Sequence, residues 1–225
     1  MSTILENYSR IRQSLEKVGR SDVQIMAVSK RQPLSHLQAA LQAGVKCFGV
    51  NYTQEGQWQM ESLGRQGIAW HFIGHIQSRK AKGVADYDMV QSLDRIEVAE
   101  KLASAAEALG KKLPVLVEIN IGRESGKSGV LTENLEPFLQ KLSGLSSLVP
   151  SGLMVMPPPL PEVEARRPFF QETKRLYDLY AEDFPFHTLS MGTSEDYLVA
   201  VTEGATLIRL GSLLLGNRPE LAPKT

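Results

Sequence analysis

The stretch HTLSMGTSEDYLVAVTEGATLIRLGS, residues 187–212, decides the fold class. It contains two short apolar runs typical of strands, His187–Met191 and Thr206–Leu210, on either side of a helical pattern over Glu195–Glu203. Two strands joined through a helix lie parallel in one sheet. A turn rich in glycine and serine follows each run, so we expect both turns at the carboxyl ends of neighbouring strands.

The same alternation extends back to the N-terminus. Six further runs are typical of strands: Gln24–Ser29, Lys46–Val50, Ala69–Ile73, Asp88–Ser92, Pro114–Ile121 and Val149–Met156. Helical patterns precede the first run and fill the intervals: Ile4–Val18, Leu34–Ala43, Gln54–Leu63, Gln77–Val84, Arg95–Leu109, Leu131–Leu142 and Glu162–Ala181. Eight such strands match a (β/α)8 barrel, although an open doubly wound sheet has the same local pattern. The count and the positions of the turns favour one α/β domain over residues 1–225, a (β/α)8 TIM barrel.

The composition is that of an ordinary globular protein without a charge bias. Of the 225 residues, 42% are hydrophobic and 22% are charged, and the formal net charge is zero. This balance gives no reason to expect nucleic acid or an anionic membrane as a partner. The single cysteine, Cys47, lies in the apolar run Val45–Val50, which favours a buried thiol in a reducing compartment. No apolar stretch approaches the length of a membrane span, and we expect a cytoplasmic monomer.

Lys30 comes directly after a strand that is too apolar for the protein surface. The preceding run is Met26-Ala27-Val28-Ser29. A lysine at this place either extends into solvent at the rim of the barrel or points into its mouth. An unprotonated lysine amine attacks aldehydes, and partial burial near other cations populates that form. Lys30 is therefore a candidate nucleophile.

The two turns of the opening stretch are candidate phosphate sites. The first combines Ser190, Thr193 and Ser194 around Gly192, and the second is Gly211-Ser212. Such turns offer hydroxyls and main-chain N–H groups to an anion; taken alone, the first is better explained as a helix cap, but two such turns at adjacent strands favour a phosphate site. Arg209, on the last strand, either reaches the ligand or forms an ion pair at the barrel end. An amine and a phosphate site at one mouth suggest a phosphorylated aldehyde, of which pyridoxal 5'-phosphate is the usual example.

Two other motifs suggest different functions and do not withstand inspection. Gly122-Arg123-Glu124-Ser125-Gly126-Lys127-Ser128 resembles the phosphate loop of nucleotide hydrolases, but three residues separate its glycines where four are required. His71 and His75 are four residues apart, but they flank a strand end, where this spacing does not produce a shared zinc-binding face.

Seven segments together resemble the pyridoxal 5'-phosphate homeostasis protein family over nearly the whole chain. They are Ala27-Val28-Ser29-Lys30, Phe48-Gly49-Val50-Asn51-Tyr52, His71-Phe72-Ile73-Gly74-His75-Ile76-Gln77, Lys127-Ser128-Gly129, Gly152-Leu153-Met154, Ser190-Met191-Gly192 and Ile208-Arg209-Leu210-Gly211. The resemblance implies a fold-type III barrel like the N-terminal domain of alanine racemase. It also implies pyridoxal 5'-phosphate bound as a Schiff base on Lys30.

The resemblance assigns further roles residue by residue. It places the phosphate on Ser190, Gly192, Thr193 and Ser194, with main-chain donors at Gly211 and Ser212. It places Arg209 at the ring nitrogen and Asn51 in the wall of the site. The chain departs from the family pattern at three positions, with Val50 where glutamate is common, Thr193 where methionine is common and Arg79 where asparagine is common.

Members of this family resemble cofactor carriers that act in vitamin B6 homeostasis and indirectly in amino-acid and keto-acid balance, without a defined catalytic reaction. A cationic arginine at the ring nitrogen is consistent with this role, because it disfavours nitrogen protonation and weakens the ring as an electron sink. Apoenzymes that depend on pyridoxal 5'-phosphate, or a regulatory protein, are the candidate partners. The alternative is an amino-acid racemase or lyase whose site a partner completes.

Overall fold

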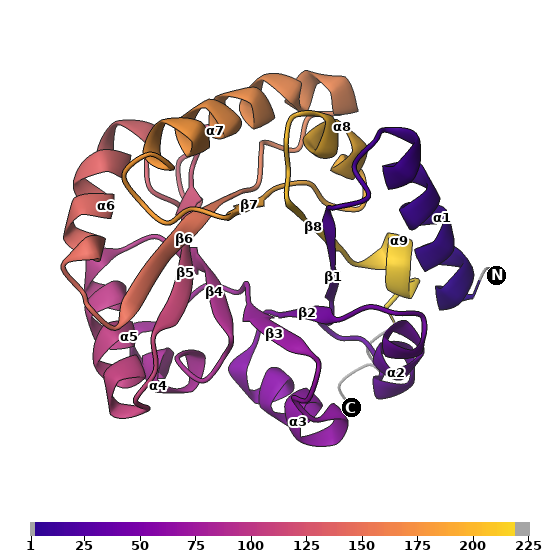
Figure 1. Ribbon diagram of the computed structural model, residues 1–225, viewed down its shortest axis with the longest axis horizontal. Coiled ribbons are helices and arrows are strands. Elements are labelled where there is room, and N and C mark those ends of the chain that lie inside the picture. The colour runs from indigo at the N-terminus through magenta and orange to yellow at the C-terminus, as the bar shows by residue number, and fades with distance from the viewer. Residues whose placement is uncertain (1–2, 219–225) are drawn as a thin grey trace.

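The computed structural model describes residues 3–218 and contains a closed barrel of eight parallel strands (Figure 1). The strands follow one another around the barrel in chain order: β1 (Gln24–Val28), β2 (Cys47–Val50), β3 (Ala69–Phe72), β4 (Met89–Leu93), β5 (Leu113–Ile119), β6 (Leu148–Val155), β7 (Thr188–Ser190) and β8 (Leu207–Leu210). Pairing of β1 with β8 closes the ring, with Met26 opposite Arg209. The barrel prediction is confirmed, and the open sheet is excluded.

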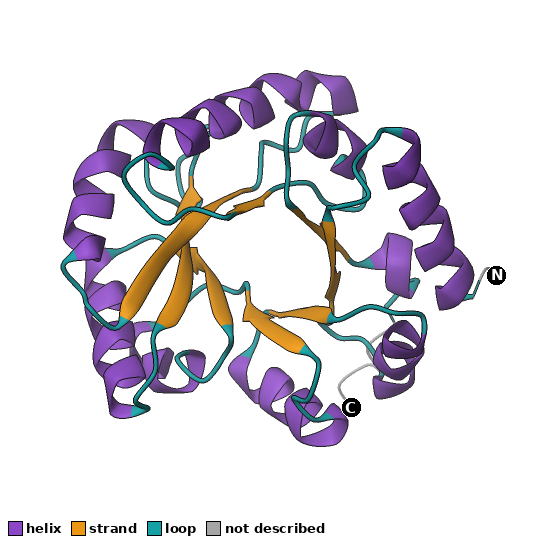
Figure 2. Ribbon diagram, viewed as in Figure 1, coloured by secondary structure: helices purple, strands orange, loops and turns teal. Residues whose placement is uncertain are grey.

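Helices form a ring outside the strands (Figure 2). They are α1 (Ile4–Lys17), α2 (Leu34–Gln42), α3 (Thr53–Leu63), α4 (Ala81–Val84), α5 (Ile96–Ala108), α6 (Leu135–Ser143), α7 (Arg167–Tyr180), α8 (Tyr197–Thr202) and α9 (Ser212–Leu215). Short 3-10 turns, at Ser78–Lys80, Thr132–Asn134 and Val163–Arg166, precede α4, α6 and α7. In residues 3–218, no helix has the length and apolarity needed to cross a membrane.

Side chains along each strand alternate between the barrel interior and the helix layer. Phe48 and Trp70 stack outside the barrel, with ring centroids 5.1 Å apart, and belong to the large core under the helices. Their neighbours in sequence point inward, where Met26, Cys47 and Leu207 form a separate apolar cluster. The interior also contains buried polar side chains, among them His71, Gln91, Ser190 and Arg209. Two of them, Ser190 and Arg209, lie at or near the carboxyl ends of β7 and β8.

Candidate functional site

A cavity of about 400 Å³ opens at the carboxyl ends of the strands. We call it the mouth cavity. Seven of the nine site residues predicted from the sequence line it: Lys30, Asn51, Thr193, Ser194, Arg209, Gly211 and Ser212. The other two, Ser190 and Gly192, do not. Residues that follow β1 and β2 therefore come together with the turn after β7, the end of β8 and the turn after it, as the barrel topology predicts, while their roles toward a ligand stay predictions.

Lys30 is held at the rim by the residues on either side of it. The Ser29 hydroxyl donates to Gln59 Oε1 (2.7 Å) and to the Gly49 carbonyl (3.1 Å), which anchors the end of β1. Arg31 adopts a left-handed conformation (φ 56°), and its N–H donates to Glu55 Oε1 (2.5 Å). The Lys30 amine lies 5.3 Å from the Tyr52 ring centroid, and residues 3–218 provide it with no ion pair. The amine is thus presented to the mouth cavity rather than to a carboxylate.

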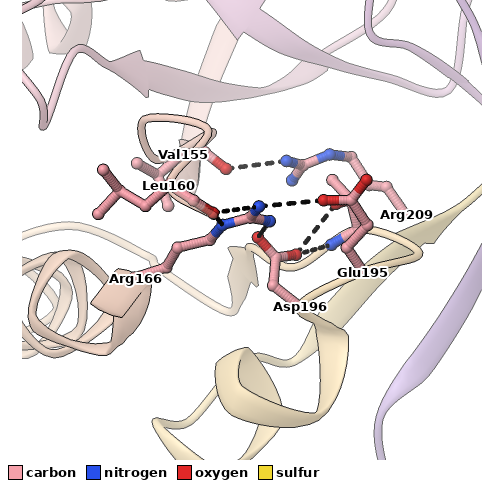
Figure 3. Close-up of polar contacts among 7 residues, drawn as sticks. Val155, Leu160, Arg166, Glu195, Asp196 and Arg209 are labelled. Carbon is pink, nitrogen blue, oxygen red and sulfur yellow. Dashed lines mark hydrogen bonds and ion pairs between the residues drawn. The ribbon is translucent and has the colours of Figure 1, made fainter. Parts of the chain in front are cut away.

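Arg209 is a buried cation without a carboxylate partner in the described chain; Figure 3 shows its contact with Val155. Its side chain is 4% exposed; Nη1 donates to the Ser190 carbonyl (2.9 Å) and hydroxyl (2.7 Å), and Nη2 donates to the Val155 carbonyl (2.8 Å). Burial lowers the pKa of Arg209 to about 10, opposed by the charges of Glu118 and Asp196. A guanidinium has five N–H donors, so two are left beyond these three bonds, and Arg209 lines the mouth cavity.

Ser190 supports Arg209 from inside the barrel and does not line the mouth cavity. Its hydroxyl is completely buried, accepts from Arg209 and donates to Gln91 Oε1 (2.7 Å). Gln91 Nε2 in turn donates to His71 Nδ1 (2.9 Å). Burial lowers the pKa of His71 to about 4, so the ring is neutral and carries its proton on Nε2. In this structure the Ser190 hydroxyl thus belongs to a hydrogen-bonded chain that orients Arg209, and its contact with a phosphate stays a prediction.

Gly192 has a packing role in the turn after β7. Its φ of +92° favours glycine, and an added Cβ would lie 2.7 Å from the Cβ of Ala200 in α8. Its carbonyl accepts from the Arg209 main-chain N–H (3.0 Å). The turn therefore sits close against α8, which explains why Gly192 shapes the site without lining it.

The next two residues of this turn are already hydrogen-bonded within the protein. The N–H and hydroxyl of Thr193 both donate to Asp196 Oδ1 (2.6 and 3.0 Å). Ser194 Oγ accepts from the Gly211 N–H (3.2 Å), which joins the turn after β7 to the turn after β8. Asp196 is 2% exposed, but its sequence context is that of an ordinary first-turn acid, which gives no sign of this role.

Two further groups lie near the mouth cavity: Asn51, which was expected there from the sequence, and Glu118, which was not. Asn51 Oδ1 is buried without a hydrogen-bond partner in the described residues, and such orphaned acceptors are rare. Glu118 pairs in register with Met154, which lines the mouth cavity. Burial and the charge of Asp94 raise the pKa of Glu118 to about 7, while Arg209 opposes the shift. Inward-facing polar residues in otherwise apolar strands were the available signal for Glu118 and Gln91.

The three departures from the family pattern, and the two motifs that resemble a phosphate loop and a zinc site, mostly lie away from the mouth cavity. Val50 is buried in the core under the helices and Arg79 is exposed, so only Thr193 among the three departures lies in the mouth cavity. Lys127 forms an ion pair with Glu124 (2.5 Å), and no helix begins there. His71 is buried whereas His75 is exposed, and the described residues contain no cluster of metal-binding side chains.

A barrel with these features is of the alanine racemase type. The model of the family "Alanine racemase, N-terminal domain" matches residues 1–219. The pyridoxal phosphate homeostasis protein of Pseudomonas aeruginosa is 36% identical over 99% of this chain and 99% of its own length, and that of Escherichia coli K12 is 33% identical over 97% and 98%. The chain therefore belongs to the alanine racemase N-terminal domain family, among the pyridoxal phosphate homeostasis proteins.

Solved structures agree with this assignment. PipY of Synechococcus elongatus, determined with pyridoxal phosphate bound, is 30% identical, has a TM-score of 0.86 and is matched over 95% of this chain and 100% of its own. Alanine racemase of Streptomyces lavendulae has a TM-score of 0.74 at 14% identity, over 96% of this chain and 59% of its own. At 14% identity, the likeness to alanine racemase shows a shared fold alone.

Proposed function

We propose that this protein binds pyridoxal 5'-phosphate in the mouth cavity and acts in its intracellular homeostasis, without a catalytic reaction of its own. The observation that carries the proposal is Arg209, a buried cation with unused donors, facing the same cavity as the unpaired amine of Lys30. A ligand with a basic or anionic acceptor and an electrophilic carbon satisfies both groups. Membership of the family, and the cofactor in PipY, support the same choice.

The residues present fit this cofactor. Bound pyridoxal 5'-phosphate supplies an aldehyde, with which a lysine amine forms a Schiff base. Lys30 is the proposed amine, and Arg209 would donate to the ring nitrogen through the N–H groups that the protein leaves free. The Ser194 hydroxyl and the Ser212 N–H group are the proposed phosphate donors, and the Gly211 N–H, which donates to Ser194 Oγ here, would join them by exchanging that acceptor for the phosphate. Asn51 offers a buried acceptor to the remaining ring substituents.

Arg209 also accounts for the proposed lack of a reaction. A group that stays positively charged beside the ring nitrogen disfavours the protonated ring, and electron withdrawal into the ring is then weak. With its pKa at about 10, Arg209 keeps its charge at neutral pH despite burial. The protein is thus suited to hold the cofactor and release it rather than to transform amino acids.

The proposed domain organisation, oligomeric state, location and partners rest on the family and on Cys47. We place one cofactor-binding barrel domain over residues 1–225, acting as a monomer in the cytoplasm, where the buried free thiol of Cys47 stays reduced. Dependent apoenzymes or a regulatory protein would receive the cofactor. Light scattering of the loaded protein measures the oligomeric state, and a dimer would overturn the proposal of a monomer.

The proposal is tested by loading the purified protein with pyridoxal 5'-phosphate, recording its absorption spectrum, and mapping the modified peptide after borohydride reduction. We expect the adduct on Lys30, its loss in Lys30→Ala and its retention in Lys127→Ala. An adduct chiefly on Lys127 would remove the assignment of Lys30. Turnover of any amino acid in a panel by the loaded protein would refute the non-catalytic role.

A further inference from the structure

A buried ion pair joins two loops that border the mouth cavity (Figure 3). Arg166, just before α7, donates from Nη1 to Asp196 Oδ2 (3.0 Å), and the two residues are 7% and 2% exposed. Arg166 also donates from Nε (3.2 Å) and Nη2 (2.8 Å) to the Leu160 carbonyl, in the proline-rich loop after β6. Its Nη2 lies 3.0 Å from Glu195, an exposed carboxylate.

Asp196 divides its two carboxylate oxygens between the two loops. Oδ2 accepts from Arg166, while Oδ1 accepts from both the N–H and the hydroxyl of Thr193. Each oxygen of this carboxylate therefore has a donor from a different loop. Because both residues are buried, removing Arg166 leaves the charge of Asp196 without its ion-pair partner, and removing either residue breaks the link between the two loops.

We propose that Arg166 and Asp196 form a positioning bridge that holds the Thr193 turn in its ligand-ready shape and keeps a phosphorylated ligand from leaving the mouth cavity. The inference rests on the proposed function. Arg166 has four of its five N–H donors committed to Leu160, Asp196 and Glu195, and so acts through the turn rather than on the ligand.

The alternative is that Arg166 binds the phosphate directly. The two roles predict opposite changes in the release rate of the phosphorylated ligand in Asp196→Asn. A direct Arg166 contact would strengthen in that variant, because a negative charge beside the phosphate disappears and the guanidinium is released. A positioning bridge would instead break, since Asn has only one acceptor oxygen and its NH2 group must face either the Arg166 donor or the Thr193 N–H donor. The direction of the change therefore separates the two roles.

The experiment measures the rate at which the loaded protein releases pyridoxal 5'-phosphate and unphosphorylated pyridoxal. We expect Arg166→Met and Asp196→Asn each to release the phosphorylated ligand roughly tenfold faster, with a smaller effect on pyridoxal and strong non-additivity in the double variant. The milder Arg166→Lys keeps the charge and provides a folded variant if Arg166→Met does not fold. Arg167→Met is the matched control, because Arg167 pairs with Glu164 and Glu203 at the surface; its release rates should equal those of the wild type.

A second measurement tests the bridge in the ligand-free protein. Hydrogen exchange at the Thr193 amide, which donates to Asp196 at 2.6 Å, should accelerate in Arg166→Met, Arg166→Lys and Asp196→Asn but not in Arg167→Met. Slower release from Asp196→Asn, or equal effects on both ligands, would overturn the bridge. Unchanged exchange at Thr193 would overturn it independently of any ligand, whereas a wild-type protein that takes up no pyridoxal 5'-phosphate would refute the proposed function instead.

Discussion

Replacing Glu118 by glutamine should stabilise the ligand-free protein at alkaline pH. In the folded protein, burial and the charge of Asp94 raise the pKa of this carboxyl from 4.5 to about 7. A raised pKa means that the folded state holds the proton more tightly than the unfolded chain. The associated stability is complete below pH 4.5 and is lost as the pH rises through about 7.

The size of the effect follows from this shift. The rise in pKa corresponds to about 3 kcal/mol in the free energy of unfolding between the two pH limits. Glutamine has nearly the same shape but does not ionise, so Glu118→Gln should match the wild type near pH 4 and exceed its stability at pH 8. For a chain of this length, such a difference moves the melting temperature by roughly 6 to 12 °C.

The assay is thermal and urea unfolding of the ligand-free protein at several pH values between 4 and 9. Glu107→Gln, on the exposed surface of α5, controls for the loss of one carboxylate and should retain the pH dependence of the wild type. The reasoning is wrong if Glu118→Gln loses stability between pH 5 and 8 as steeply as the wild type does. That result would mean that Glu118 ionises in the folded barrel without penalty.

Three further predictions concern groups around Arg209. Burial lowers the pKa of His71 from 6.5 to about 4. The free energy of unfolding should therefore fall by about 3 kcal/mol as the pH falls from 6.5 to 4, and urea titrations of His71→Asn should show a smaller loss. Ser190→Ala should weaken the binding of pyridoxal and of pyridoxal 5'-phosphate by the same factor in spectroscopic titrations, because the hydroxyl supports Arg209. Selective weakening of the phosphorylated form would instead support the phosphate contact expected from the sequence. Gly192→Ala should lower the free energy of unfolding by about 2 kcal/mol or more beyond Gly126→Ala, whose φ is also positive but whose Cβ would meet open space.

The sequence predicted the barrel well because strand and helix periodicity are local properties. The apolar runs lie within a few residues of the observed strands, and barrel closure then brings their carboxyl ends to one mouth. Lys30 and Arg209 were found in this way: each is a cation at or near the end of an apolar strand. Their meeting at one cavity follows from topology, without knowledge of any side-chain conformation.

Details that depend on side-chain direction and on distant partners could not be predicted. Ser190 reads as a turn hydroxyl, but it is the last residue of β7 and points inward to Gln91, ninety-nine positions away in sequence. Thr193 offered two donors to a phosphate, yet Asp196 accepts both. The connection from Asp196 to Arg166 crosses from one loop to another, and no local pattern indicates it.

The chain from His71 through Gln91 and Ser190 gives Arg209 its chemical character. Each link is neutral, because burial keeps His71 unprotonated and the other two groups do not ionise near neutral pH. The chain therefore fixes the position of the guanidinium without neutralising its charge, which a carboxylate at the place of Ser190 would do. A cation held in this way cannot pass a proton on to a ligand at neutral pH, and it keeps donors directed at the mouth cavity. On the proposed function, the same residues that orient Arg209 would favour tight holding of a ligand over its chemical conversion.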